Sequence, residues 1–101
     1  MISRMAKISF DYDGTISTAK GTDLAQRFID KGDQVYIISA RERKSGMLDK
    51  ADQLGIRHSR VYATGSNKAK VEKVKELNIS KHYDNNPDVI KDLPGVGVLF
   101  K

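Results

Sequence analysis

The stretch Phe10-Asp11-Tyr12-Asp13-Gly14-Thr15 follows the apolar residues of a short strand-like run and carries two acids separated by one residue. Because side chains alternate between the faces of a strand, Asp11 and Asp13 are expected on the same side. At the carboxyl end of a parallel strand, both would reach the edge where α/β proteins bind ligands. Repulsion between two such acids predicts a cation between them, with Mg²⁺ preferred by oxygen ligands. An ordinary polar turn, closed by Gly14, gives the same pattern.

The whole chain has the size and composition of one folded domain, and we expect residues 1–101 to form it. Of the 101 residues, 39% are hydrophobic and 31% are charged, as in ordinary globular domains. The 18 basic and 13 acidic residues give a net charge of +5. This balance fits a phosphate-bearing or polyanionic partner, and it fits a solvated basic surface equally well.

Several classes of protein are excluded by composition. The chain has no cysteine, so disulfides, thiolate catalysis and cysteine metal sites are ruled out. Its two histidines, His58 and His82, are too few for a histidine zinc site. No run approaches the roughly 18 apolar residues of a membrane span, and residues 1–7 are too short and polar for a secretory signal. A cytoplasmic location without a membrane partner is the resulting expectation.

Apolar spacing predicts helices that alternate with strands along the chain. We expect helices at about 23–31, 68–77 and 87–93 and another between Ser45 and Gly55, and strands ending at Phe10 and covering 34–40, 59–63, 82–83 and 96–100. Thr22, Ser45 and Asn86 are the expected N-caps. This alternation predicts a doubly wound, parallel, five-stranded α/β sheet with flanking helices.

Further polar residues follow the other strands. Ser39 ends the second strand, and the basic residues Arg41, Arg43 and Lys44 come just beyond it. In the helix at 68–77 the apolar side is formed by valines and a leucine, and the lysines are expected mostly on the outside: Lys68, Lys70, Lys73 and Lys75. The basic trio is either a solvated loop or part of a phosphate site.

Taken together, these polar residues resemble the four motifs of the haloacid dehalogenase (HAD) superfamily of phosphohydrolases. Asp11-Tyr12-Asp13-Gly14-Thr15 matches the first motif, Ser39 in Ile-Ile-Ser-Ala-Arg the second, a lysine the third, and Asp84-Asn85-Asn86-Pro87-Asp88 the acidic fourth. The resemblance covers nearly the whole chain. It implies a Rossmann-like sheet with strand order 3-2-1-4-5.

The resemblance also implies a reaction. Asp11 would be the nucleophile that forms an aspartyl-phosphate, and Asp13 the general acid and base. Mg²⁺ would be held by Asp11, Asp84 and the backbone carbonyl of Asp13. The phosphoryl oxygens would be bound by Ser39, Ala40 and the third-motif lysine, for which Lys68 is preferred over Lys70 because it begins the helix.

Three positions are open. Many relatives have a second acid after the fourth-motif aspartate, whereas here Asn85 follows Asp84. Asp88 could support the metal site or could be an acid favoured by the helix dipole. Arg41 is a further candidate for support of the phosphate site.

Spacing between the motifs bears on the substrate. The gaps are too short for an inserted cap domain, and capless relatives have open sites suited to large substrates. The order of elements resembles the phosphatase half of polynucleotide kinase 3′-phosphatases, so a phosphorylated nucleic-acid end is one expected partner. Small nucleotide or sugar phosphates, and a phosphate-binding domain without turnover, are the alternatives. The protein is expected to be a monomer or a small homo-oligomer.

Overall fold

The computed structural model describes residues 5–101 and contains one five-stranded, all-parallel sheet. The strand order is β3-β2-β1-β4-β5, and flanking helices make this a small Rossmann-like α/β fold without a separate cap in the described residues. The predicted fold class is confirmed. The elements are β1 (Lys7–Phe10), α1 (Ala19–Asp30), β2 (Gln34–Ser39), α2 (Met47–Leu54), β3 (Val61–Ala63), α3 (Asn67–Glu76), β4 (Lys81–Asp84), α4 (Pro87–Lys91) and β5 (Gly97–Leu99).

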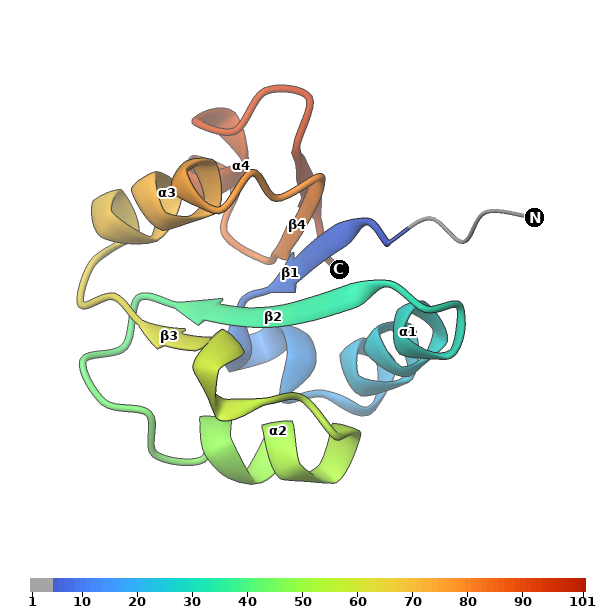
Figure 1. Ribbon diagram of the computed structural model, residues 1–101. Helices are drawn as coiled ribbons and strands as arrows, with labels where there is room; N and C mark the ends of the chain where they lie inside the picture. Colours follow the sequence, from blue (N-terminus) through green and yellow to red (C-terminus); the bar gives the residue numbers. More distant parts are fainter. Residues whose placement is uncertain (1–4) are drawn as a thin grey trace.

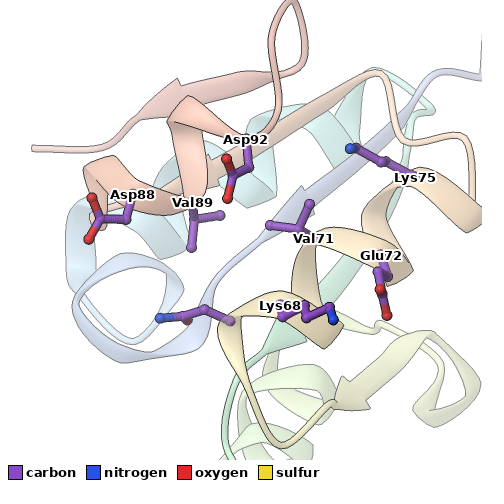
Figure 2. Close-up of a pocket in the computed structure, with 8 residues that line it drawn as sticks. Lys68, Val71, Glu72, Lys75, Asp88, Val89 and Asp92 are labelled. Carbon is purple, nitrogen blue, oxygen red and sulfur yellow. The ribbon is translucent and has the colours of Figure 1, made fainter.

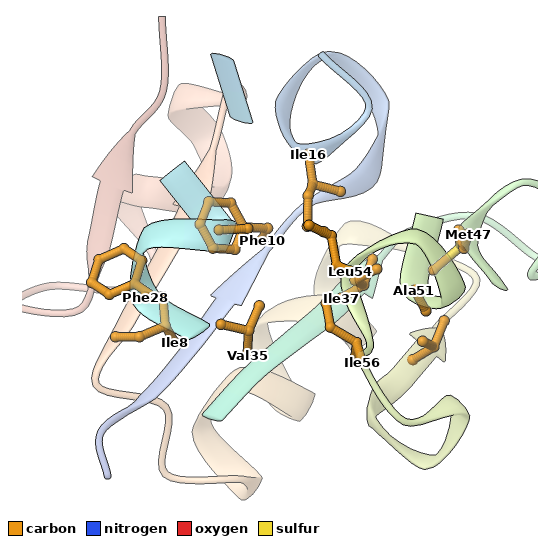
Figure 3. Packing of buried hydrophobic residues seen from close by; sticks show 12 residues of the cluster. Ile8, Phe10, Ile16, Phe28, Val35, Ile37, Met47, Ala51, Leu54 and Ile56 are labelled. Carbon is orange, nitrogen blue, oxygen red and sulfur yellow. The ribbon is translucent and has the colours of Figure 1, made fainter. Parts of the chain in front are cut away.

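The helices cover the two faces of the sheet in pairs. Helices α1 and α2 lie on one face, and α3 and α4 lie on the other (Figure 1). On the α1/α2 face, alternate residues of β1 and β2 pack with the helices in the larger core cluster, which includes Phe10 and Ile37 (Figure 3). On the α3/α4 face, Ile38 packs with Val74 and Leu93. Both faces of β2 are therefore buried, as is usual for an interior strand of a parallel sheet that has helices on both faces.

The first helix begins earlier than the sequence predicts. Thr18, rather than Thr22, is its N-cap, and the Thr18 hydroxyl accepts a hydrogen bond from the Gly21 N–H at 3.0 Å. Thr22 lies inside the helix, where its hydroxyl donates to the Ile16 carbonyl at 2.8 Å. The early start shortens the connection after β1 to a tight turn, Tyr12–Ile16, and a few residues.

Two other boundaries differ from expectation. Helix α2 begins at Met47 after Gly46, whose φ of 76° ends the preceding loop, so Ser45 is not its cap. Strand β3 begins at Val61 because His58–Arg60 form a 3-10 turn. The expected cap of α4 is confirmed, since the Asn86 side chain accepts from the Asp88 N–H at 2.9 Å and Pro87 is the first helical residue.

Candidate active site

Asp11 comes directly after β1, the central strand, and its backbone continues the pairing with β4. The Asp11 N–H donates to the Tyr83 carbonyl at 2.9 Å. This bond sets Asp11 beside Asp84, the last residue of β4. Two acids that are 73 residues apart in sequence thus meet at the carboxyl edge of the sheet, where ligands bind in open α/β folds.

A buried lysine joins these two acids. Lys70 Nζ of α3 lies 3.0 Å from Asp11 Oδ1 and 2.8 Å from Asp84 Oδ2. All three side chains are buried, with 3%, 8% and 0% exposure for Lys70, Asp11 and Asp84. We call this group the Asp11–Lys70–Asp84 cluster. Since charges are seldom buried without partners, its placement at the ligand edge marks it as a candidate active site.

Burial and charge affect the two acids differently. Burial raises the pKa of Asp11, and the nearby Asp84 carboxylate adds to this rise against the opposing effect of Lys70. Burial also acts on Asp84, but hydrogen bonds from His82 and Lys70 outweigh it and lower the pKa of Asp84. Asp84 is therefore the more firmly ionised member of the cluster.

Lys70, and not Lys68, contacts the two acids. The expectation that Lys68 is the lysine placed toward the ligand edge is therefore wrong. Successive residues of a helix are about 100° apart, and two positions separate the lysines, so they lie on nearly opposite sides of α3. The expectation that Lys70 faces outward is wrong for the same reason. Lys70 precedes Val74 by one turn and shares its buried side. That spacing was the available sequence signal.

Asp13 belongs to a different group of contacts. Both of its carboxylate oxygens accept from Arg41, with Nε 2.8 Å from Oδ2 and Nη2 2.9 Å from Oδ1. Arg41 also donates to the Ser45 carbonyl at 2.9 Å, and its guanidinium carbon lies 4.9 Å from the Tyr12 ring centre. These hydrogen bonds from Arg41 lower the pKa of Asp13. The Asp13 side chain is 59% exposed, at the rim of the candidate site.

Ser39 and Ala40 lie at the end of β2. Ser39 is buried, and its hydroxyl oxygen accepts from the Arg41 N–H at 3.1 Å. Thr64 donates to the Ser39 carbonyl through both its N–H and its hydroxyl, at 2.8 Å each. Ala40 is half-buried in the same loop. The loop that carries both residues is thus fixed, although no hydrogen bond links Ser39 to the cluster within residues 5–101.

Asn85 packs against the first loop. A Cβ placed on Gly14, whose φ is 71°, would come within 2.4 Å of Asn85 Nδ2. The positive φ favours glycine at this position. The exposed Asn85 side chain thus lies close to the backbone of the loop after β1.

Asp88 and Lys68 lie together at another place. Both line a pocket of about 370 Å³ between α3 and α4, with the aliphatic floor formed by Val71 and Val89 (Figure 2). The remaining lining residues are Asn67, Glu72, Lys75 and Asp92. None of Asp11, Asp13 and Asp84 lines this pocket. The structure therefore brings Asp11, Lys70 and Asp84 together, places Asp13 and Arg41 at the rim, and leaves Lys68 and Asp88 outside that group.

Two buried residues next to the cluster lie outside the site that the sequence predicts. Ser9 of β1 and His82 of β4 are register partners, both fully buried. His82 Nδ1 lies 2.7 Å from Ser9 Oγ, and His82 Nε2 lies 2.9 Å from Asp84 Oδ2. Side chains two positions apart on a strand lie on the same face, and Ser9 and His82 each precede an acid of the cluster by two residues. This spacing is the sequence pattern that places both residues next to the cluster.

The carboxylate oxygens of the cluster are suitable ligands for a metal ion. Among residues 5–101, no three histidine, aspartate or glutamate side chains are arranged to hold a metal ion by themselves. Mg²⁺ needs less, because it keeps several waters and binds through one or two carboxylates together with substrate phosphate. Asp11 and Asp84 supply two carboxylates at one edge, and each has an oxygen not bonded to Lys70. This donor set fits Mg²⁺ in chemistry and number.

No helix within residues 5–101 is long and apolar enough to cross a membrane. In comparisons with known proteins, no family model, no curated protein and no solved structure matches the chain.

Proposed function

We propose that this protein is a phosphomonoester hydrolase of the HAD type that depends on Mg²⁺ and forms an aspartyl-phosphate on Asp11. The observation that carries the proposal is the Asp11–Lys70–Asp84 cluster at the carboxyl edge of the central strands. A buried carboxylate beside a fixed cation suits attack on an anionic phosphoryl group. The motif resemblance described above supports the same reaction, and we propose a cytoplasmic location for it.

Each residue then has a role. Asp11 attacks phosphorus while the bond to the leaving oxygen breaks, and Asp13 gives that oxygen a proton. Water next attacks the phosphorus of the aspartyl-phosphate while Asp13 takes a proton from this water. The bond between phosphorus and Asp11 breaks, so inorganic phosphate leaves and the Asp11 carboxylate is regenerated. Lys70 holds Asp11 in place and offsets the negative charge. The Asp11 and Asp84 carboxylates and the Asp13 carbonyl would hold Mg²⁺, which would offset negative charge on the phosphoryl group.

Arg41 must move for this reaction to proceed. With both oxygens bonded to the guanidinium and its pKa lowered, Asp13 is a poor proton donor. A substrate phosphate offers Arg41 an alternative partner of matching bidentate geometry. Arg41, Ser39 and the loop that contains Ala40 are thus proposed to bind the substrate's phosphoryl group.

The proposed substrate is a large phosphate ester, with a phosphorylated nucleic-acid end as the leading candidate. In support, the described residues include no separate cap, and Arg43 and Lys44 lie exposed beside Arg41. Small nucleotide or sugar phosphates compete with this substrate. We expect activity on a 3′-phosphorylated oligonucleotide to fall steeply with salt, since backbone binding releases counterions. Equal salt dependence for an oligonucleotide and an aryl phosphate would exclude the nucleic-acid substrate.

The decisive experiment measures phosphate release from an aryl phosphate, nucleotides and a 3′-phosphorylated oligonucleotide, with Mg²⁺ and with a chelator. Asp11→Asn should abolish release, and Asp13→Asn should lower kcat by about 100-fold to 10,000-fold. Asp23→Asn is the matched control, because Asp23 is an exposed aspartate on α1. Release that is identical in the wild type and Asp11→Asn would refute the proposal.

A second candidate function is phosphate binding without turnover. The Arg41–Asp13 pairing favours it, because the expected acid is engaged by a cation. Under this alternative, the wild-type chain would bind a fluoride-based phosphoryl mimic with Mg²⁺ and would release no phosphate from any substrate in the panel.

A further inference from the structure

Two buried residues, Ser9 and His82, form a chain of contacts that ends on one carboxylate oxygen of Asp84. His82 Nε2 and Lys70 Nζ both lie within hydrogen-bond distance of the same oxygen, Asp84 Oδ2, at 2.9 and 2.8 Å. The other oxygen, Oδ1, accepts from the Asn86 N–H at 3.0 Å. Each carboxylate oxygen can accept two hydrogen bonds. Both acceptor sites of Oδ2 are therefore occupied, whereas Oδ1 has one acceptor site left for another ligand.

The tautomer of His82 follows from these neighbours. An ionised carboxylate can only accept hydrogen bonds, so the proton must lie on the His82 Nε2 that faces Asp84. Nδ1 is then free to accept from the Ser9 hydroxyl at 2.7 Å. Ser9 is paired with His82 in the β1–β4 ladder and is fully buried, so the contact has no competition from solvent.

We propose that Ser9 and His82 are a positioning pair, which commits Oδ2 of Asp84 to the protein and thereby directs Oδ1 toward the cation of the active site. The Asp84 carboxylate keeps the proton on His82 Nε2, Ser9 occupies His82 Nδ1 and so fixes the ring, and His82 holds the carboxylate that is assigned to the metal. Outer hydrogen-bond partners of this kind orient metal ligands in proteins. The inference rests on the proposed function, because it assigns Asp84 to the metal.

The chain offers variants that separate positioning from folding. His82→Leu removes the donor to Asp84, whereas His82→Gln keeps an amide N–H at a similar reach. Ser9→Ala removes only the partner of Nδ1. His58 is the matched control, since its Nε2 also lies against an aspartate, Asp52 Oδ1 at 2.6 Å, but at an exposed place.

The experiment measures Mg²⁺ affinity by isothermal titration calorimetry on variants whose circular dichroism matches the wild type. His82→Leu should weaken Mg²⁺ binding by about 10-fold to 100-fold. His82→Gln should recover most of the Mg²⁺ affinity, and the affinity of Ser9→Ala should lie between those of His82→Leu and His82→Gln. His58→Leu should bind Mg²⁺ as tightly as the wild type. Nitrogen-correlated NMR of the His82 ring should show a proton on Nε2.

Two results would overturn the positioning pair alone. One is a folded His82→Leu variant with unchanged Mg²⁺ affinity, which would show a purely structural contact. The other is a ring with its only proton on Nδ1, which could not donate to Asp84. Absence of Mg²⁺ binding by the wild-type chain is a distinguishable result, because it would overturn the metal dependence of the proposed function and the pair with it.

Discussion

Lys70 is the residue on which the buried charges depend. Replacement by Met keeps most of the side-chain volume but leaves Asp11 and Asp84 without their shared cation. We expect the free energy of unfolding to fall by about 3 kcal/mol at neutral pH, as when one partner of a buried ion pair is removed. Urea unfolding followed by circular dichroism measures this loss.

Lys68→Met is the control for that variant, because Lys68 is exposed on the other side of α3. It should change the free energy of unfolding by no more than about 0.5 kcal/mol. The Lys70→Met deficit should also shrink at low pH, where protonation removes the repulsion between the two acids. Equal losses in the two variants would contradict a special role for Lys70.

The ion pair between Asp13 and Arg41 should make the stability of the protein depend on pH. Because Arg41 lowers its pKa in the folded protein, the pairing contributes stability above the ordinary aspartate pKa and loses it as the pH falls through the lower folded value. In Arg41→Gln, the pKa of Asp13 should return to the ordinary range. Carbon-detected NMR titration of the Asp13 carboxyl checks this, with Arg43→Gln as control.

The positions of site residues could be predicted from the sequence where those residues end a regular strand. Asp11, Ser39 and Asp84 stand at strand ends, and strands of a parallel sheet end at one edge, so their neighbourhood followed from the sequence. Asp13 did not follow the same rule, because the chain turns at Tyr12–Ile16 and the alternation of a strand no longer applies there. Its partner Arg41 depends on the path of a loop, which spacing does not encode.

At the scale of the elements, α1 packs closely on the turn Tyr12–Ile16. A Cβ on Gly21 would lie 1.8 Å from the Thr15 carbonyl oxygen and 3.0 Å from Ile16 Cα. Both are backbone atoms and cannot rotate away. Gly21→Ala should therefore push α1 from the turn that carries Asp13 and cost about 3 kcal/mol, the upper range for overpacking.

Thermal unfolding of Gly21→Ala tests this prediction against Asp23→Ala, a change at an exposed position of the same helix. The alanine should be neutral or favourable at position 23, since it is the better helix former. A Gly21→Ala variant as stable as the wild type would show that α1 and the turn can separate without cost.

Gly21 also explains the mistaken start of α1. Glycine is a poor helix former, so residues 16–21 look like a connector by local propensity. Tertiary contact overrides that preference, because only glycine allows the helix to pack on the turn. The cap of α4 was predictable, since Asn86 followed by Pro87 specifies a helix start through purely local chemistry.

For the whole molecule, one sheet joins two helical layers, and this makes a prediction about cooperativity. Phe10 is buried on the α1/α2 face and Leu93 on the α3/α4 face. Phe10→Ala should lower the free energy of unfolding by about 3–5 kcal/mol and Leu93→Ala by about 2–5 kcal/mol. In each variant the two faces should still unfold together, because they share β1 and β2.

Far-ultraviolet circular dichroism and tyrosine absorbance measure this cooperativity. Tyr83 packs with the α1/α2 layer, and Tyr36 packs with the α3/α4 layer, so the tyrosine signal reports both faces. Superimposed transitions by the two methods are the expected result. A tyrosine transition that precedes the loss of secondary structure would mean that one layer melts alone.

At this scale the sheet itself was predictable, because strands that alternate with helices permit few parallel arrangements. The strand order followed from the motif resemblance, and the observed order agrees with it. The end of each short strand was less predictable, since β3 and β5 have only three residues each and local turns decide their limits.

The order of the strands has a practical consequence. Gly65 lies in an exposed turn with open space around it, between the N-terminal part of the chain that holds Asp11 and the shorter C-terminal part that holds Lys70 and Asp84. Division there would yield two fragments, each with one helical layer and neither with the complete cluster. Because β4 pairs directly with β1, re-association of the fragments would rebuild the cluster, and the protein could serve as a split reporter.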